Sequence, residues 1–161
     1  MASTFVSGGT PSPGEPVVLF LHGYGADERD LPDLMKFLPE LPWASLRAPE
    51  KTDFGGFAWF AITTPLNPSE VEVVEATDKI WHWADEFLPE DSPLIVIGFS
   101  QGGLLAIHLL RVHPERYRAS ISLSGFLAPG LVRGTAPADD RIAPLNIPTF
   151  FGYGNSDTVI A

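Results

Sequence analysis

The sequence predicts a single α/β domain over residues 1–161, built on a mostly parallel sheet with helices on both faces. Short apolar runs alternate along the chain with segments of helical periodicity, which is the pattern of repeated strand–helix units. The chain is 45% hydrophobic and 19% charged, a composition that supports one sizeable core in 161 residues. It contains no internal repeat, low-complexity tract or interdomain linker.

The first half of the chain contains two expected strands and one expected helix. The continuous apolar run 17–21 is typical of a strand buried on both faces, and Phe5-Val6 suggests a short edge strand before it. Apolar residues at helical spacing predict a helix over 31–38 that Pro39 ends, and 43–48 has the composition of a further strand.

The second half continues this alternation. A long helix is expected from the candidate N-cap Ser69 to the neighbourhood of Pro89. Its apolar face comprises Val73, Ala76, Ile80, Ala84 and Phe87. The remaining elements are strands at 94–97, 119–123 and 149–151, and a helix at 103–112.

Two long segments, 50–68 and 125–148, resist assignment to helix or strand. Both are rich in Gly and Pro, and both exceed the usual length of a connection in a compact domain. Long loops on an α/β core are often binding loops or lids, so we expect such a role here.

The most informative motif is Gly98-Phe99-Ser100-Gln101-Gly102, between an expected strand and an expected helix. This is the context that a G-x-S-x-G nucleophile elbow requires. A turn this tight forces the serine into a strained backbone, and side chains in place of the two glycines would collide with it. The serine hydroxyl then lies above the first turn of the helix, whose N–H groups and dipole favour developing negative charge. We therefore expect Ser100 to be an acyl-transfer nucleophile, with a structural tight turn as the alternative.

A second motif, His22-Gly23-Tyr24-Gly25, follows the first buried strand. Attack on an ester creates an oxyanion, and catalysis needs N–H donors fixed where that charge appears. In the hydrolase architecture one donor belongs to the residue after the nucleophile, here Gln101, and the other to a glycine-bearing loop after an earlier strand. Tyr24 is positioned to supply the second donor through its backbone, while Gly23 and Gly25 let that loop turn inward. A plain glycine turn is the alternative.

With these motifs in place, the sequence resembles the phospholipase/carboxylesterase family of α/β-hydrolases, in particular its carboxylesterase/acyl-protein thioesterase branch. The matching segments are 21–27, 47–49, 59–60, 98–103 and 154–160. The resemblance implies a serine that attacks carboxylic esters or thioesters without a metal or an organic cofactor. It also implies that the catalytic residues follow in the order Ser, Asp, His, and that His22 supports the oxyanion loop.

Asp157 matches the triad acid of this family, because it lies in a turn after the expected strand 149–151. An Asx-turn role is the structural alternative, and Asp139 and Asp140 are less favoured candidates for the acid. The family match of Trp59-Phe60 suggests an acyl-pocket wall; the alternative is a local cluster that packs the loop. An apolar wall without a basic cluster favours neutral short-to-medium acyl esters.

The resemblance places the catalytic histidine well beyond Asp157, after one more helix and strand. The four histidines of the chain all precede Asp157, and each has a structural explanation: loop support, solvent exposure, partial burial with a hydrogen bond, and a helix C-terminus. In chain order they are His22, His82, His108 and His113. We therefore expect a C-terminally incomplete domain that lacks its last helix and strand and is inactive as it stands.

The incomplete domain leaves an open sheet edge beside Phe150 and Phe151. We expect this edge to be covered by further chain, by a homodimer partner or by a complementing chain. Two functions stay open. The first is a serine carboxylic-ester hydrolase; the second is a non-catalytic fragment or subunit that keeps the fold and binds acyl compounds or a complementing chain.

Charge and composition limit the classes of partner that we expect. The formal net charge of −10 disfavours nucleic acid and anionic membranes. No apolar stretch reaches the length of a membrane span, and the first residues lack the features of a signal peptide, so we expect a cytoplasmic protein. The absence of cysteine excludes disulfides, thiolate metal sites and a cysteine nucleophile.

Overall fold

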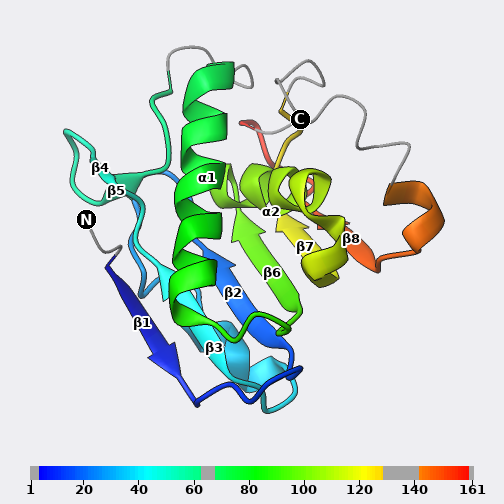
Figure 1. Ribbon diagram of the computed structural model, residues 1–161. Coiled ribbons are helices and arrows are strands. Elements are labelled where there is room, and N and C mark those ends of the chain that lie inside the picture. Colours follow the sequence, from blue (N-terminus) through cyan, green and yellow to red (C-terminus); the bar gives the residue numbers. More distant parts are fainter. Residues whose placement is uncertain (1–3, 63–67, 129–141, 160–161) are drawn as a thin grey trace.

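A six-stranded sheet forms the centre of the computed structural model, which describes residues 4–62, 68–128 and 142–159 (Figure 1). The order across the sheet is β1 (Phe5–Gly8), β3 (Trp43–Leu46), β2 (Val17–Leu21), β6 (Leu94–Phe99), β7 (Tyr117–Leu123) and β8 (Thr149–Gly152). β1 is antiparallel to β3, and all other neighbours are parallel. The expected strands and the mostly parallel sheet are thus confirmed.

Residues of the central strands alternate between two hydrophobic clusters, one on each face of the sheet. Val17, Leu19 and Leu21 pack on the face covered by α1 (Glu70–Phe87) and α2 (Gln101–Val112) (Figure 1). Val18 and Phe20 pack on the opposite face. Because both faces are covered, β2 is apolar and buried throughout, as expected for a central parallel strand.

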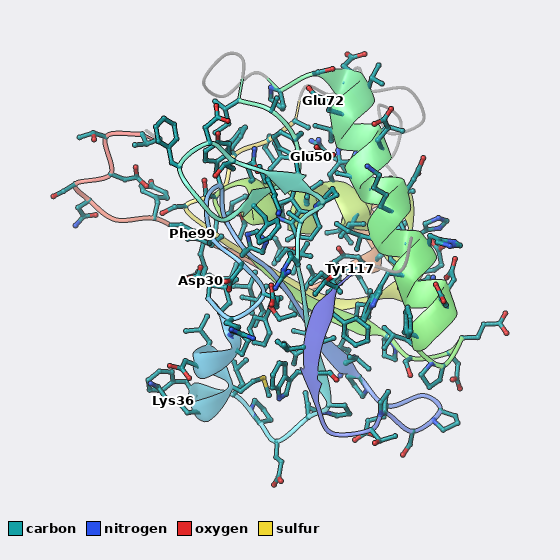
Figure 2. All side chains as sticks on the ribbon, turned by 90° about the vertical axis from the view of Figure 1, so that its left-hand side faces the viewer. Asp30, Lys36, Glu50, Glu72, Phe99 and Tyr117 are labelled. Carbon is teal, nitrogen blue, oxygen red and sulfur yellow. The ribbon has the colours of Figure 1, made fainter. Side chains whose placement is uncertain are left out.

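The second face is covered by η1 (Pro32–Phe37), a six-residue 3-10 helix instead of the expected helix over 31–38. Figure 2 shows η1, marked by Lys36, on the side of the sheet opposite to α1. The expected apolar residues still pack inward, because Leu31 is buried and Leu34 and Met35 contact the same cluster. The proline at the start of η1 and Pro39 just beyond its end confine the helical segment to this short stretch.

Two further expectations need correction. Segment 50–68 contains a small antiparallel hairpin, β4 (Glu50–Lys51) and β5 (Phe57–Ala58), where no regular structure was expected. Phe87, expected on the apolar face of α1, is 40% exposed; it ends that helix beside edge strand β1. Its ring packs against Phe5 at 5.1 Å between centroids. The other four expected face residues of α1 are buried.

The remaining regular elements are two 3-10 helices, η2 (Pro114–Arg116) and η3 (Ala143–Leu145). Residues 129–141 of the second long loop, including Asp139 and Asp140, lie outside the described residues. Among the described residues, no helix combines the length and the apolar character needed to cross a membrane.

Candidate active site

Ser100 lies between β6 and α2 in a strained backbone conformation, with φ 52° and ψ −112°. Residues other than glycine rarely adopt positive φ, and such strain persists only where the surrounding structure enforces it. The Ser100 N–H donates to the Leu123 carbonyl at 2.9 Å, and the Ser100 carbonyl accepts from the Leu104 N–H at 3.0 Å. The turn is therefore held from β7 on one side and from α2 on the other.

The glycines that flank this serine are sterically required. A Cβ on Gly98 would lie 1.9 Å from the Gly102 carbonyl oxygen, and a Cβ on Gly102 would lie 1.9 Å from the Leu21 carbonyl oxygen. Each overlap involves backbone atoms, which cannot rotate away as a side chain can. The expected collision with the turn is confirmed at Gly98, whereas at Gly102 the overlap is with the end of β2. The two close approaches fix the start of α2 against the ends of β6 and β2.

The predicted oxyanion loop, residues 22–26, leaves β2 directly beside the predicted elbow. Leu21 and Gly98 are partners in the parallel ladder, and a Cβ on Gly23 would lie 2.8 Å from the Phe99 ring. The hairpin holds the loop from the other side, because the Gly25 N–H donates to the Phe57 carbonyl at 2.9 Å and the Phe57 N–H donates to the Ala26 carbonyl at 2.8 Å. Gly25 has φ +79°, which the loop requires.

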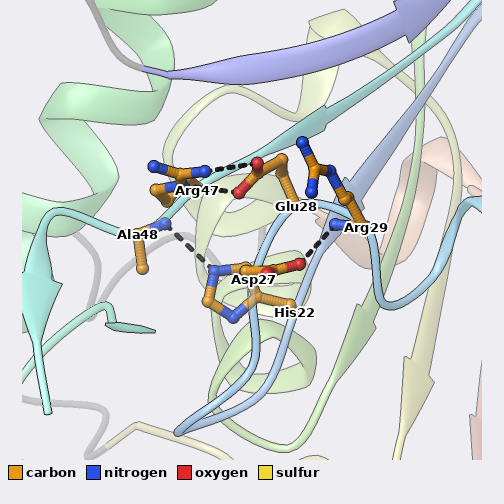
Figure 3. Close-up of polar contacts among 6 residues, drawn as sticks. All are labelled: His22, Asp27, Glu28, Arg29, Arg47 and Ala48. Carbon is orange, nitrogen blue, oxygen red and sulfur yellow. Dashed lines mark hydrogen bonds and ion pairs between the residues drawn. The ribbon is translucent and has the colours of Figure 1, made fainter. Parts of the chain in front are cut away.

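The imidazole of His22 is completely buried beneath this loop. Its Nε2 accepts the Ala48 N–H at 3.1 Å (Figure 3), so the ring proton resides on Nδ1, which donates to the Gly23 carbonyl at 2.7 Å. Burial lowers the pKa of His22 below its ordinary value. Both ring nitrogens are thus engaged with backbone groups, and His22 is not placed to act as a general base.

Gln101, the first residue of α2, uses its side chain as well as its backbone. The amide is 1% exposed; its Oε1 accepts the Trp59 N–H at 3.1 Å and its Nε2 donates to the Phe60 carbonyl at 2.8 Å. The Trp59 indole N–H donates in turn to the His22 carbonyl at 2.8 Å. The side chains of Trp59 and Phe60 belong to the core, at 5% and 2% exposure, as the packing alternative expects.

The exposed parts of Trp59 and Phe60 border a surface cavity of about 370 Å³, which Tyr24 also lines. Of the other apolar residues in segment 50–68, Phe54 and Ile62 are 94% and 53% exposed. The acyl-pocket role of Trp59 and Phe60 therefore stays a prediction, and it would depend on a small part of each side chain.

A partly buried ion pair lies just beyond residues 22–26. Arg47 binds Glu28 through two hydrogen bonds, of 2.6 Å from Nε and 2.5 Å from Nη2 (Figure 3). The Glu28 side chain is 2% exposed, and the hydrogen bond from Arg47 lowers the pKa of its carboxyl group. The Arg47 guanidinium also lies 4.6 Å from the centroid of the Phe57 ring. The pair thus joins the loop after β2, the end of β3 and the hairpin.

Asp157 lies in a turn five residues beyond β8 and is half-buried. Its N–H donates to the Gly154 carbonyl at 2.9 Å, and its Oδ1 accepts the Val159 N–H at 3.0 Å, which is an Asx-turn arrangement. Because β6, β7 and β8 are parallel neighbours, Ser100 and Asp157 both follow the carboxyl ends of strands at one edge of the sheet. Sites of α/β sheets form at this edge.

The other three histidines lie on α1, on α2 and directly after α2. His82 is exposed on α1, and His108 is buried in α2 at 1% exposure, two helical turns or about 12 Å along the helix from Ser100. His113 directly follows α2, where its Nδ1 bonds the Glu115 carboxylate at 2.9 Å and its ring meets Trp81. None of these three histidines follows the carboxyl end of a strand, where Ser100 and Asp157 lie.

A family model described as phospholipase/carboxylesterase matches residues 5–161. The chain belongs to the phospholipase/carboxylesterase family. Its fold is similar to that of a carboxylesterase from Bacillus cereus, with a TM-score of 0.75 and 16% identity over 96% of this chain and 85% of that one. Acyl-protein thioesterase 2 of Zea mays gives a TM-score of 0.72 and 21% identity over 98% and 78%. A carboxylesterase from Mesorhizobium loti gives 0.67 and 20% over 88% and 80%.

Membership confirms the predicted family and the α/β-hydrolase fold, and it makes the chain a member of a family of phospholipases and carboxylesterases. Small-molecule esters are the substrates that such a family implies. Sequence reasoning missed the side-chain amide of Gln101 and the partner of Glu28. Neither carries a local signal, because the bonding partners lie 41 or 42 residues away in the first case and 19 in the second. Within the described ranges, no cluster of His, Cys, Asp or Glu side chains is placed to hold a metal ion.

Proposed function

We propose that the protein is a serine carboxylic-ester hydrolase that forms an acyl-enzyme on Ser100. The observation that carries this proposal is the backbone of Ser100, held at φ 52° between two sterically required glycines at the carboxyl end of a central strand. Strain of this kind is characteristic of functional sites. The Ser100 oxygen attacks the ester carbonyl, the alcohol or thiol leaves, and water then releases the acid from the enzyme.

Backbone N–H groups of Gln101 and Tyr24 stabilise the oxyanion in this proposal. The Gln101 N–H belongs to the first turn of α2, where N–H groups have no partner within the helix and the helix dipole favours negative charge. Tyr24 follows Gly23, whose Cα lies against Phe99 beside the nucleophile. Fixed donors of this kind are effective because they need no reorganisation when the charge develops.

Asp157 orients the general base in this proposal, and none of the four histidines of the chain is that base. His22 uses both ring nitrogens on backbone groups, and the other three lie on α1, on α2 and directly after α2 as described. Added imidazole should therefore raise the rate of ester hydrolysis that depends on Ser100. The Ser100→Ala variant supplies the background for imidazole acting alone. A rate that imidazole leaves unchanged, in an active protein, would show that a base is already in place.

The assignment of Ser100 is tested by hydrolysis of p-nitrophenyl butyrate and by labelling with a fluorophosphonate probe. Ser100→Ala should abolish both. Ser124→Ala is the matched control, because Ser124 also has positive φ, at 45°, and directly follows the neighbouring strand β7. Equal hydrolysis by the Ser100→Ala variant and the wild type would overturn the proposal.

A second function is favoured by the exposed edge strand of the sheet: a non-catalytic subunit that binds acyl compounds or a complementing chain. The edge strand β8 supports a partner of this kind, since Phe150 and Phe151 are 57% and 49% exposed. Binding of butyrate or octanoate without any labelling by the fluorophosphonate probe would favour this second function. A homodimer or a complementing chain over β8 would appear as a concentration-dependent change in mass in solution.

A further inference from the structure

We infer that the side chain of Gln101 is a positioning residue that fixes the two oxyanion donors relative to each other, an inference that rests on the proposed function. The backbone N–H of the same residue is one of those donors. A single residue would then supply one donor and hold the loop that supplies the other.

The first step is the pairing of the Gln101 amide with the backbone of Trp59 and Phe60. This stretch offers one N–H and one carbonyl to the same side chain, and a carboxamide satisfies both because it carries an acceptor and a donor. An ionised carboxylate matches only the N–H, and a thioether matches neither group well. The amide is 1% exposed, so water does not replace these bonds when they are lost.

The second step leads from Trp59 to His22. The indole N–H donates to the His22 carbonyl at 2.8 Å, and the two rings lie 5.5 Å apart between centroids. Trp59 is 5% exposed and packs in the main core, and its backbone N–H is the group that Gln101 accepts. The backbone at the start of the oxyanion loop is thereby tied to the start of α2.

The third step is the peptide between Gly23 and Tyr24. Its carbonyl accepts from His22 Nδ1 at 2.7 Å and from the Ala26 N–H at 3.3 Å. A trans peptide is planar, and its N–H points opposite to its carbonyl. Holding the Gly23 carbonyl toward the buried imidazole therefore directs the Tyr24 N–H away from the core. The network that begins at one oxyanion donor ends at the peptide that carries the other.

The variants Gln101→Met and Gln101→Glu test this role, because each keeps the backbone N–H and changes only the amide. Gln101→Met should lower kcat by about 10- to 100-fold, the range expected when a catalytic group is misplaced by a fraction of an ångström, and should change KM by less than about threefold. Ser120→Ala is the matched control. Ser120 is also buried and donates to the α2 backbone, at the Ala106 carbonyl, but its hydrogen bonds among the described residues do not reach residues 22–26 or 59–60.

Gln101→Glu adds a readout that a merely structural role would not change. Burial raises the pKa of the introduced carboxyl group, and in its protonated form that group again donates to the Phe60 carbonyl. The ratio of variant to wild-type kcat should therefore increase as the pH falls. A pH-independent ratio would count against the donor role of the amide.

Hydrogen exchange of the Trp59 indole N–H provides a measurement that does not need activity. In Gln101→Met this proton should exchange at least about tenfold faster than in the wild type, while in Ser120→Ala it should not change. Trp59→Phe identifies the signal and should itself lower kcat. If Ser100→Ala abolishes hydrolysis but Gln101→Met leaves kcat unchanged, the positioning role alone is overturned. Hydrolysis that does not depend on Ser100 would overturn the proposed function, and the indole exchange would still test the network.

Discussion

Replacing Gly98 by alanine should disrupt the turn that presents the serine. The added Cβ would lie 1.9 Å from the Gly102 carbonyl oxygen, about 1.5 Å short of the 3.4 Å at which ordinary contact begins. The start of α2 cannot retreat by this amount, because Gly102 itself faces the Leu21 carbonyl at a distance that leaves no room for a Cβ. The clash must therefore be relieved by displacing backbone in the most buried part of the sheet.

Insertion of a methyl group into a packed core costs about 1–3 kcal/mol, and this site belongs at or above the upper end because only backbone can move. A loss of about 3 kcal/mol in a domain of this size lowers Tm by about 6–12 °C. Gly154→Ala is the matched control, since a Cβ at Gly154 meets nothing within 4 Å. Surface changes of this kind stay within about 0.5 kcal/mol.

The assay is urea unfolding followed by tryptophan fluorescence, with the midpoint and the slope compared among wild type, Gly98→Ala and Gly154→Ala. We expect a large drop in the midpoint for Gly98→Ala alone, accompanied by loss of ester hydrolysis. Equal midpoints for the two variants would refute the argument that the elbow glycines are required by backbone overlap.

Three further predictions concern pH and substrate. Burial lowers the pKa of His22, so between the folded pKa and about 6.5 the unfolded chain binds more protons than the folded chain. The free energy of unfolding should therefore rise with pH across that range. His22→Gln should flatten the slope of the urea midpoint against pH. Because Arg47 lowers the pKa of Glu28, that contribution to stability is present above about pH 4.3 and lost as the pH falls through the folded pKa. Arg47→Met should therefore move acid unfolding, followed by circular dichroism, to higher pH, whereas exposed Arg118→Met should not. Trp59→Ala should alter the preference among butyrate, octanoate and longer esters if the residue borders the acyl pocket, and an unchanged chain-length profile would count against that role.

The features that the sequence predicted are those with local causes. A strand buried on both faces must be apolar throughout, so β2 and the core of β6 are visible as continuous runs. A turn that needs glycine on both sides of a serine is visible as a motif of five consecutive residues. The matching loop after β2 was visible for the same reason, because Gly25 at φ +79° is required by its own backbone.

What the sequence did not predict depends on contacts between distant segments. The hairpin at 50–58 is short and is held by backbone bonds to the oxyanion loop, so no hydrophobic periodicity reveals it. Glutamate is usually found at the surface, and the burial of Glu28 depends on Arg47, which directly follows β3 and binds its carboxylate. The η1 segment has helical spacing, but a run of six residues bounded by prolines does not show whether the turns will be α or 3-10.

The hydrogen bonds that hold the oxyanion loop suggest why substitutions remote from substrate should change kcat. Gly25 is held by a hairpin carbonyl and Gly23 by a buried imidazole, while Gln101 holds the segment that reaches His22. The side chains of His22 and Gln101 present their polar atoms to backbone groups and are shielded from water. In the proposed mechanism the oxyanion donors act through their position, so a small displacement of either N–H group should lower kcat. The exposed aromatic residue Phe54 should therefore tolerate substitution with little effect on kcat, whereas the hidden amide of Gln101 should not.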